Sequence, residues 1–157
     1  MTEFPELQLD TRELEREGPS YTVDSLQELR QEVGSEATIY FLIGDDLLPT
    51  LNQWSHWEAL TDYAHLVVAK RPGEFLAIAA EVAAWWHDRE APLAQLSSLP
   101  AGYVSRLECS LVDVSSSEIR QLLKSGERET EMIPYAVMEY IRFHKLYENL
   151  SQTEAVL

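Results

Sequence analysis

TIYFLIG, residues 38–44, is a continuous run of β-branched, aromatic and aliphatic side chains bounded by polar residues. Such a run predicts a strand that is buried on both faces, and strands of this kind belong mainly to parallel sheets. Asp45 and Asp46 follow at its carboxyl end. Open α/β sheets bind ligands beyond the carboxyl ends of their strands. This stretch therefore predicts a parallel α/β sheet, and it predicts that a ligand site lies at the carboxyl ends of the strands.

Strand and helix signals alternate on both sides of this run. Two more strands are predicted, HLVVAK (65–70) and YVSRLECSLVDV (103–114), with a loop or linker over residues 89–102. Helices are predicted at residues 23–33 with Thr22 as N-cap and Gly34 as terminator, at 74–88, at 116–127, and at 133–147 with Pro134 in the first turn. The alternation predicts an α/β fold with a parallel sheet.

Composition restricts the classes of function. The chain has 157 residues, 45% of them hydrophobic, and a formal net charge of −15. This charge argues against non-specific binding to nucleic acid or to an anionic membrane, although a local cluster of donors could still hold a nucleotide phosphate. The acidic N-terminus does not resemble a signal peptide, no apolar run reaches the roughly 18 residues of a membrane span, and Cys109 is the single cysteine. A cytoplasmic location is expected.

VDVSSSEIR, residues 112–120, allows two interpretations. Ser115 and Glu118 fit a capping box, which is a common structural motif. However, Arg120 lies near a helix N-terminus, where a cation opposes the helix dipole unless an anion binds there. Backbone N–H groups, serine hydroxyls and a guanidinium could together surround phosphate oxygens. The alternative is that Arg120 turns toward an acidic neighbour.

The histidines indicate neither a metal site nor a catalytic triad. The four of them, His56, His65, His87 and His144, lack the HxxH or HxxxH spacing of zinc ligands. No nucleophile has an evident histidine and acid partner. Each histidine is therefore interpreted as structural or exposed, and no metal ligand is assigned.

The VSSSEIR stretch resembles the ISSTxIR signature of nucleotidyltransferases that transfer an adenylyl group from ATP, with Ser117 at the usual Thr position. Five further stretches narrow the resemblance to the bacterial nicotinate-nucleotide adenylyltransferases: SYT (20–22), FLIGDDLL (41–48), Trp54, HLVVAKRPG (65–73) and the closing IPYAVMEYIRFHKLY. They cover nearly the whole chain in the family's order. The resemblance implies a Rossmann-like fold, and transfer of an adenylyl group from ATP to nicotinate mononucleotide in NAD biosynthesis.

The resemblance also implies roles for particular residues. The ATP side would comprise Gly44, Asp46, Ser115, Ser116, Ser117 and Arg120, with Ser117 and Arg120 as the catalytic pair and Mg²⁺ arriving with ATP. The nicotinate mononucleotide side would comprise Thr22, Trp54, Ser55 and Arg71. Trp54 would stack on the pyridinium ring, and Thr22 with backbone donors near Ser55 would hold the carboxylate. Asp45, at the variable position of G-x-D, and Lys70, beside Arg71, receive no role.

One part of the family pattern is missing. Neither GGTFDP nor HxGH occurs in this sequence, although the family opens with GGTFDPxHxGH and a central strand. We therefore expect residues 1–157 to be a single partial domain, the C-terminal two-thirds of the enzyme, with weak activity or none. Loss of the central strand would leave TIYFLIG at an unpaired edge. The alternatives are a non-catalytic nucleotide-binding or interaction remnant, and a related adenylyltransferase with another acceptor.

Overall fold

The computed structural model describes residues 6–70, 77–108, 115–125 and 132–147. The described contacts divide the chain into two compact units, residues 1–111 and 112–157, and each is described by itself. The first unit is built from α1 (Arg12–Glu15), α2 (Thr22–Val33), β1 (Tyr40–Gly44), η1 (Asp45–Gln53), η2 (Trp57–Ala59), α3 (Leu60–Tyr63), β2 (His65–Ala69), α4 (Ala80–Arg89), α5 (Leu93–Leu96) and β3 (Val104–Leu107). The second contains α6 (Ser116–Ser125) and α7 (Tyr135–Phe143). The single domain predicted over 1–157 stays a prediction.

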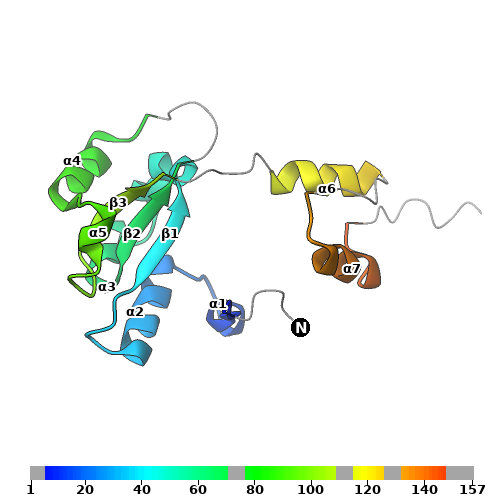
Figure 1. Cartoon of the computed structure of the whole chain (residues 1–157), viewed down its shortest axis with the longest axis horizontal. Coiled ribbons are helices and arrows are strands. Elements are labelled where there is room, and N and C mark those ends of the chain that lie inside the picture. The colour runs from blue at the N-terminus through cyan, green and yellow to red at the C-terminus, as the bar shows by residue number, and fades with distance from the viewer. Residues whose placement is uncertain (1–5, 71–76, 109–114, 126–131, 148–157) are drawn as a thin grey trace, which may run out of the picture. The chain divides into compact units, whose positions relative to one another are not determined.

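The three strands form a parallel sheet in the order β1-β2-β3, with their arrows pointing the same way (Figure 1). In the register, Tyr40 pairs with His65 and Gly44 with Ala69, while Leu66 pairs with Val104. The α/β class with a parallel sheet, predicted from the sequence, is confirmed. All three carboxyl ends consequently meet at one edge of the sheet.

The main core lies on one face of the sheet. Leu66 and Val68 of β2 pack there with side chains from β1, α2, α3, α4 and η1. The opposite face of β2 carries Val67, which packs with Ala91 and Leu96 in a smaller cluster. This alternation buries β2 on both faces, which explains its uninterrupted apolar sequence.

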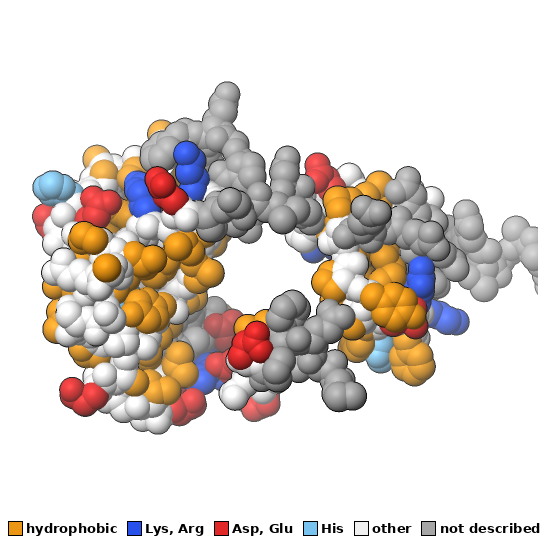
Figure 2. Space-filling model, in the orientation of Figure 1, with side chains coloured by type: hydrophobic (Ala, Val, Ile, Leu, Met, Phe, Trp, Pro, Cys, Tyr) orange, Lys and Arg blue, Asp and Glu red, His pale blue; other side chains and the backbone are white. Residues whose placement is uncertain are grey.

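The prediction that TIYFLIG is fully buried is wrong. β1 lies at the end of the strand order, and its residues Tyr40 and Leu42 are 48% and 59% exposed. The strand register places both side chains on the same face of the sheet as Val67. On that face the smaller cluster of Ala91 and Leu96 packs onto Val67 and leaves Tyr40 and Leu42 exposed. Hydrophobic side chains accordingly gather on the face of the first unit that is seen in Figure 2.

Several predicted boundaries also shift. Tyr21, not Thr22, is the N-cap of α2, and no side-chain hydrogen bond caps this helix; Gly34 ends it as predicted, with φ of 87°. The helix predicted from residue 74 begins at Ala80 in the described residues. The predicted loop 89–102 contains the short helix α5 and a parallel bridge from Glu90 to Val104.

Arg30 organises the amino-terminal end of the sheet. It lies in the last turn of α2, where a cation also suits the helix dipole. Its guanidinium donates to the Tyr63 carbonyl from Nε at 3.1 Å and from Nη2 at 2.7 Å, and to the Pro100 carbonyl at 2.8 Å. It also donates to the carbonyls of Gly34 and Ala37. One side chain thus satisfies the carbonyls of three connecting segments.

Two more arginines attach α1 to α2. Arg12 donates to Glu32 at 3.0 Å, and Arg16 donates to Glu28 at 2.8 Å. Arg12 also donates to the Asp10 carboxylate, and this hydrogen bond lowers the pKa of Asp10. These charged contacts hold a segment whose leucines, Leu9 and Leu14, are exposed.

His65 is a structural histidine, as predicted, because it is fully buried at the start of β2. Its Nδ1 accepts the Tyr103 N–H at 3.1 Å, so the proton lies on Nε2, which donates to the Leu99 carbonyl at 2.9 Å. The ring stacks on Tyr103 with 5.6 Å between ring centres. His65 therefore attaches β2 to the segment that leads into β3.

Replacement of His65 by Leu should destabilise the protein by about 2–4 kcal/mol, because the Tyr103 N–H and the Leu99 carbonyl both lose their partner. Urea unfolding followed by far-UV circular dichroism measures this change. His87→Leu is the matched control, since His87 is exposed on α4, and it should change stability by less than about 0.5 kcal/mol. Equal losses in the two variants would contradict the assigned role of His65.

Candidate functional site

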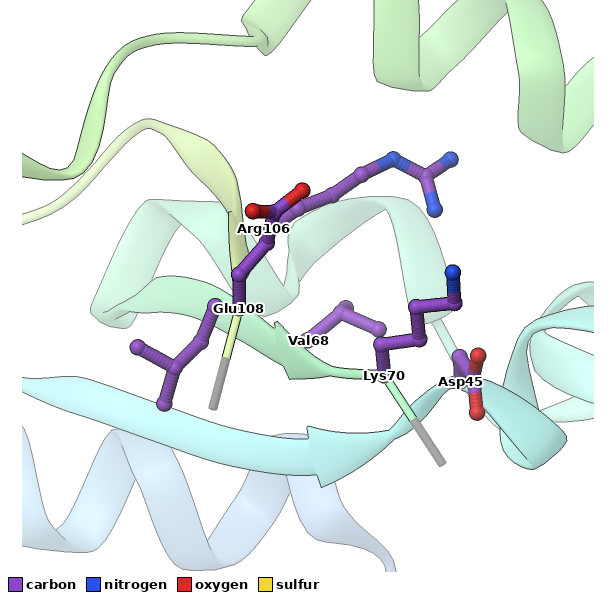
Figure 3. Close-up of a pocket in the computed structure, with 6 residues that line it drawn as sticks. Asp45, Val68, Lys70, Arg106 and Glu108 are labelled. Atoms are coloured by element: carbon purple, nitrogen blue, oxygen red, sulfur yellow. The ribbon is translucent and has the colours of Figure 1, made fainter. Parts of the chain in front are cut away.

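A pocket of about 300 Å³ opens at the carboxyl ends of the three strands. Its lining comes from the residue after β1, from the end of β2 and from the end of β3: Asp45, Val68, Lys70, Arg106, Leu107 and Glu108 (Figure 3). Val68 is buried, whereas Lys70, Arg106 and Glu108 are exposed. A pocket at this edge is where a parallel α/β sheet binds its ligands.

The polar lining follows directly from the parallel topology. β2 ends at Ala69, and the Lys70 N–H still donates to the Leu107 carbonyl at 3.4 Å, which extends the pairing with β3 by one step. Side chains beyond that step leave the sheet at its edge. Charged residues that are distant in sequence are thereby brought together, two acidic and two basic.

Gly44 and Asp46, which the sequence assigned to the ATP side, flank Asp45 in the chain. Gly44 is the last residue of β1, and η1 opens with Asp45 and Asp46. The backbone of Gly44 is extended, with φ of −79° and ψ of 151°, a conformation that any residue adopts. Backbone conformation therefore does not require a glycine at position 44, and the close approach of a ligand stays a prediction.

The predicted mononucleotide residues lie in two places of the first unit. Trp54 is half-buried directly after η1 and packs against the main core, and its backbone N–H donates to the Leu51 carbonyl at 3.0 Å. The Ser55 hydroxyl lies 2.9 Å from His56 Nδ1. Thr22 is half-buried at the first position of α2. Arg71 lies outside the described residues.

The serine-arginine motif forms the N-terminus of α6 in the second unit. The Glu118 N–H lies 3.5 Å from Ser115 Oγ, a long contact that fits half of the predicted capping box. Arg120 Nη2 donates to Ser117 Oγ at 3.3 Å, so the predicted catalytic pair shares one face of the helix. Ser116, Ser117 and Arg120 are all exposed. Their local arrangement leaves hydroxyls and a guanidinium accessible at a helix N-terminus.

Two residues of the pocket, Arg106 and Glu108, were missed by the prediction from sequence, and two others, Asp45 and Lys70, had been passed over. A sequence signal exists for the second pair, because Asp45 follows the first predicted strand and Lys70 ends the second, the position where parallel topology places functional side chains. Arg106 and Glu108 lie within the predicted strand 103–114 and gave no such signal, whereas the observed β3 ends at Leu107. Within the described residues, no cluster of three or more His, Cys, Asp or Glu side chains is arranged to hold a metal ion. No helix there is long and apolar enough to cross a membrane.

Comparison with known proteins agrees with this geometry. The cytidylyltransferase-like family model matches residues 6–122. A probable nicotinate-nucleotide adenylyltransferase of Klebsiella pneumoniae is 41% identical over 145 residues, which cover 91% of this chain and 67% of that protein. The chain belongs to the nicotinate-nucleotide adenylyltransferase family. The resemblance seen in the sequence is confirmed.

Other relatives give the same assignment. The Herminiimonas arsenicoxydans protein with the same name is 38% identical over 90% of this chain and 66% of its own length. The chain thus spans about two thirds of the length of these relatives. The solved structure of Plasmodium falciparum nicotinic acid mononucleotide adenylyltransferase complexed with APC superimposes with a TM-score of 0.54 at 21% identity, over 83% of this chain and 59% of that one. This likeness supports the fold.

Two glycines at element ends should respond oppositely to replacement by Ala. Gly34→Ala should destabilise the protein by about 1–2 kcal/mol, because its φ of 87° is strained for a side chain. Gly44→Ala should leave stability unchanged or raise it by up to about 1 kcal/mol, since its backbone is already extended. Thermal and urea unfolding measure both. A marked loss of stability in Gly44→Ala would show that this glycine is required by packing.

Proposed function

We propose that this chain carries out, or forms most of the site for, adenylyl transfer from ATP to nicotinate mononucleotide. The observation that carries the proposal is the polar pocket at the carboxyl ends of the parallel strands, directly beside Gly44 and Asp46. The relatives support the proposal, because a protein that matches 91% of this chain is named a probable nicotinate-nucleotide adenylyltransferase. The products are nicotinate adenine dinucleotide and pyrophosphate, a step of NAD biosynthesis, and the substrates are small molecules, which suits a cytoplasmic protein.

The reaction needs positioning more than a protein nucleophile. A phosphate oxygen of the mononucleotide attacks the α-phosphorus of ATP; the new P–O bond forms as the bond to the β-phosphate oxygen breaks, and pyrophosphate leaves. Mg²⁺ enters bound to the ATP phosphates and neutralises charge on the leaving group. In-line alignment of the two nucleotides supplies much of the rate enhancement.

Each group of residues has a part in this scheme. Arg120 donates to the ATP phosphates, together with the hydroxyls of Ser116 and Ser117, because a guanidinium fork matches phosphate oxygens. The Ser115 hydroxyl caps α6 and its N-terminal N–H groups favour an anion. Asp46 accepts hydrogen bonds from ribose hydroxyls, and Gly44 lets the adenosine approach the backbone.

The nicotinate side depends on an aromatic face and on hydrogen-bond donors. Trp54 stacks on the electron-poor pyridinium ring through its accessible part. Thr22 and the backbone near Ser55 hold the carboxylate, and Arg71 contacts the mononucleotide. Hydrogen-bond donors around this carboxylate also favour nicotinate over nicotinamide mononucleotide. The NH2 group of the nicotinamide amide is itself a donor, so it cannot accept hydrogen bonds from them.

The first prediction concerns the reaction itself. Pyrophosphate release from ATP and Mg²⁺ by this chain, at the weak rate expected of a partial domain, should depend on nicotinate mononucleotide. Arg120→Lys should lower kcat/KM for ATP by about 10–100-fold, because a lysine cannot bind phosphate with a fork. A coupled pyrophosphate assay measures both. Arg142→Lys on α7, where Arg142 pairs with Glu139 at 3.2 Å, is the matched control and should retain activity.

Three other outcomes separate the alternatives. Release of pyrophosphate with phosphopantetheine in place of the mononucleotide would favour a related adenylyltransferase with another acceptor. Folded protein that binds ATP and releases no pyrophosphate would favour a non-catalytic nucleotide-binding module. Equal losses in Arg120→Lys and Arg142→Lys would remove the special role of Arg120.

Trp54→Ala should raise the KM for nicotinate mononucleotide by about tenfold, the worth of one aromatic stacking contact of roughly 1–2 kcal/mol. The KM for ATP should change by less than about twofold. Trp54→Phe, which keeps an aromatic face, should recover most of the affinity. Steady-state kinetics with each substrate varied in turn measures the split, and parallel loss of affinity for both substrates would show that Trp54 acts through the core it packs against.

A further inference from the structure

Residues 52–59, which we call the Trp54 segment, connect η1 to α3 and contain both Trp54 and Ser55. Leu51 before the segment and Leu60 after it are buried, with 0% and 1% of their surfaces exposed. Every residue between these two leucines is half-buried or exposed. The core therefore fixes the two ends of the segment, whereas its path between them depends on other contacts.

The backbone of the segment is strained at its middle. His56 has the left-handed conformation, with φ of 49° and ψ of 40°. A residue other than glycine keeps this conformation only where the surrounding structure holds it. The Ser55 hydroxyl lies 2.9 Å from His56 Nδ1, but this contact is internal to the segment and cannot fix its position. Partners outside the segment are needed on both sides of His56.

Helix α4 supplies those partners. Before His56, the Asn52 side-chain amide donates to the Glu81 carboxylate at 2.6 Å. After it, the indole N–H of Trp85 donates to the Glu58 carbonyl at 3.3 Å, and the Trp85 ring meets the Trp57 ring edge-on, with 5.2 Å between ring centres. Glu81 and Trp85 are four positions apart, so they lie on one face of the helix.

α4 is a firm support because it is anchored in the main core. Val82, Trp85 and Trp86 are buried, with 0%, 6% and 5% of their surfaces exposed. The two tryptophans differ in one respect: the Trp85 N–H bonds to the Trp54 segment, whereas the Trp86 N–H has no hydrogen-bond partner among the described residues. Adjacent residues of equal burial therefore separate the contact with the segment from burial in the core.

We propose that Trp85, assisted by Glu81, is a positioning residue for nicotinate mononucleotide. From α4 it holds the Trp54 segment in the shape that presents the Trp54 ring and the donors near Ser55 before the ligand arrives. A segment that is already ordered loses little conformational freedom on binding, so its order raises affinity without a direct contact to the ligand. This inference rests on the proposed function and adds two residues of α4 to the nicotinate side.

Amide hydrogen exchange followed by NMR tests the positioning without any ligand. The N–H groups of Trp54 and Ala59 each donate to a backbone carbonyl within or next to the segment, at 3.0 and 2.9 Å, so their exchange reports on its order. In Trp85→Phe, which keeps an aromatic ring and loses the N–H, both should exchange at least about fivefold faster. The Leu66 N–H of β2 should change by less than about twofold, because the sheet keeps its pairing.

Isothermal titration calorimetry tests the effect on the ligand. Trp85→Phe should weaken binding of nicotinate mononucleotide by about 3–10-fold, the loss expected for one hydrogen bond, and should leave ATP affinity within about twofold. Trp86→Phe is the matched control and should keep both affinities within about twofold. Glu81→Ala, at an exposed position where folding is not at risk, should weaken the mononucleotide in the same direction, whereas Asp88→Ala, also exposed on α4, should not.

Three outcomes would overturn the positioning role. Equal changes in Trp85→Phe and Trp86→Phe would assign Trp85 to the core alone. Unchanged exchange of the Trp54 and Ala59 N–H groups would show that the segment does not depend on α4. Parallel loss of ATP and mononucleotide affinity in Trp85→Phe would show a general loss of structure.

The binding and exchange measurements need no turnover, which separates this inference from the proposed reaction. If the expected differences appear and the wild-type chain releases no pyrophosphate, the positioning role stands and adenylyl transfer by this chain fails. If the wild-type chain releases pyrophosphate and Trp85→Phe binds the mononucleotide as tightly as the wild type, the reaction stands and the positioning role is wrong. If the wild-type chain does not bind the mononucleotide, both are wrong.

Discussion

The parallel pairing of β2 with both of its neighbours is the constraint on which the first unit depends. β2 is hydrogen-bonded on both edges and buried on both faces, from His65 to Val68. Since a parallel pair aligns strand ends of the same kind, the pairing decides that amino ends gather at one edge and carboxyl ends at the other. The core, the amino-terminal network and the pocket all follow from this alignment.

The two edges of the sheet use polar groups for different purposes. At the amino-terminal edge, Arg30 and His65 have their hydrogen-bonding groups directed to backbone partners in the connecting segments. Such contacts stabilise because they satisfy carbonyls that would otherwise be buried without partners. At the carboxyl-terminal edge, Lys70 and Glu108 are exposed around a pocket. Stability is concentrated at the first edge, and the capacity to bind a ligand at the second.

The acidic character of the chain makes the local charge pattern more informative. With a net charge of −15, long-range attraction would not bring a nucleotide phosphate to the protein. The proposed phosphate contact therefore relies on short-range groups whose geometry is held by local structure, the guanidinium of Arg120 beside the Ser117 hydroxyl. This arrangement lies within one helix and needs no overall positive charge.

The sequence by itself determined the strands, the parallel class and the family, because buried parallel strands are uninterrupted apolar runs and the SSSEIR and G-x-D motifs are local in the chain. It could not determine that Tyr40 and Leu42 are exposed, since exposure depends on the place of β1 in the strand order and on where α5 packs. It also missed Arg106 and Glu108, and it passed over Lys70 in favour of its neighbour. These residues become a site only when three strand ends, more than 60 positions apart from Asp45 to Glu108, meet at one edge. Local sequence patterns indicate secondary structure and family motifs. Only the pairing of the strands brings distant side chains close together.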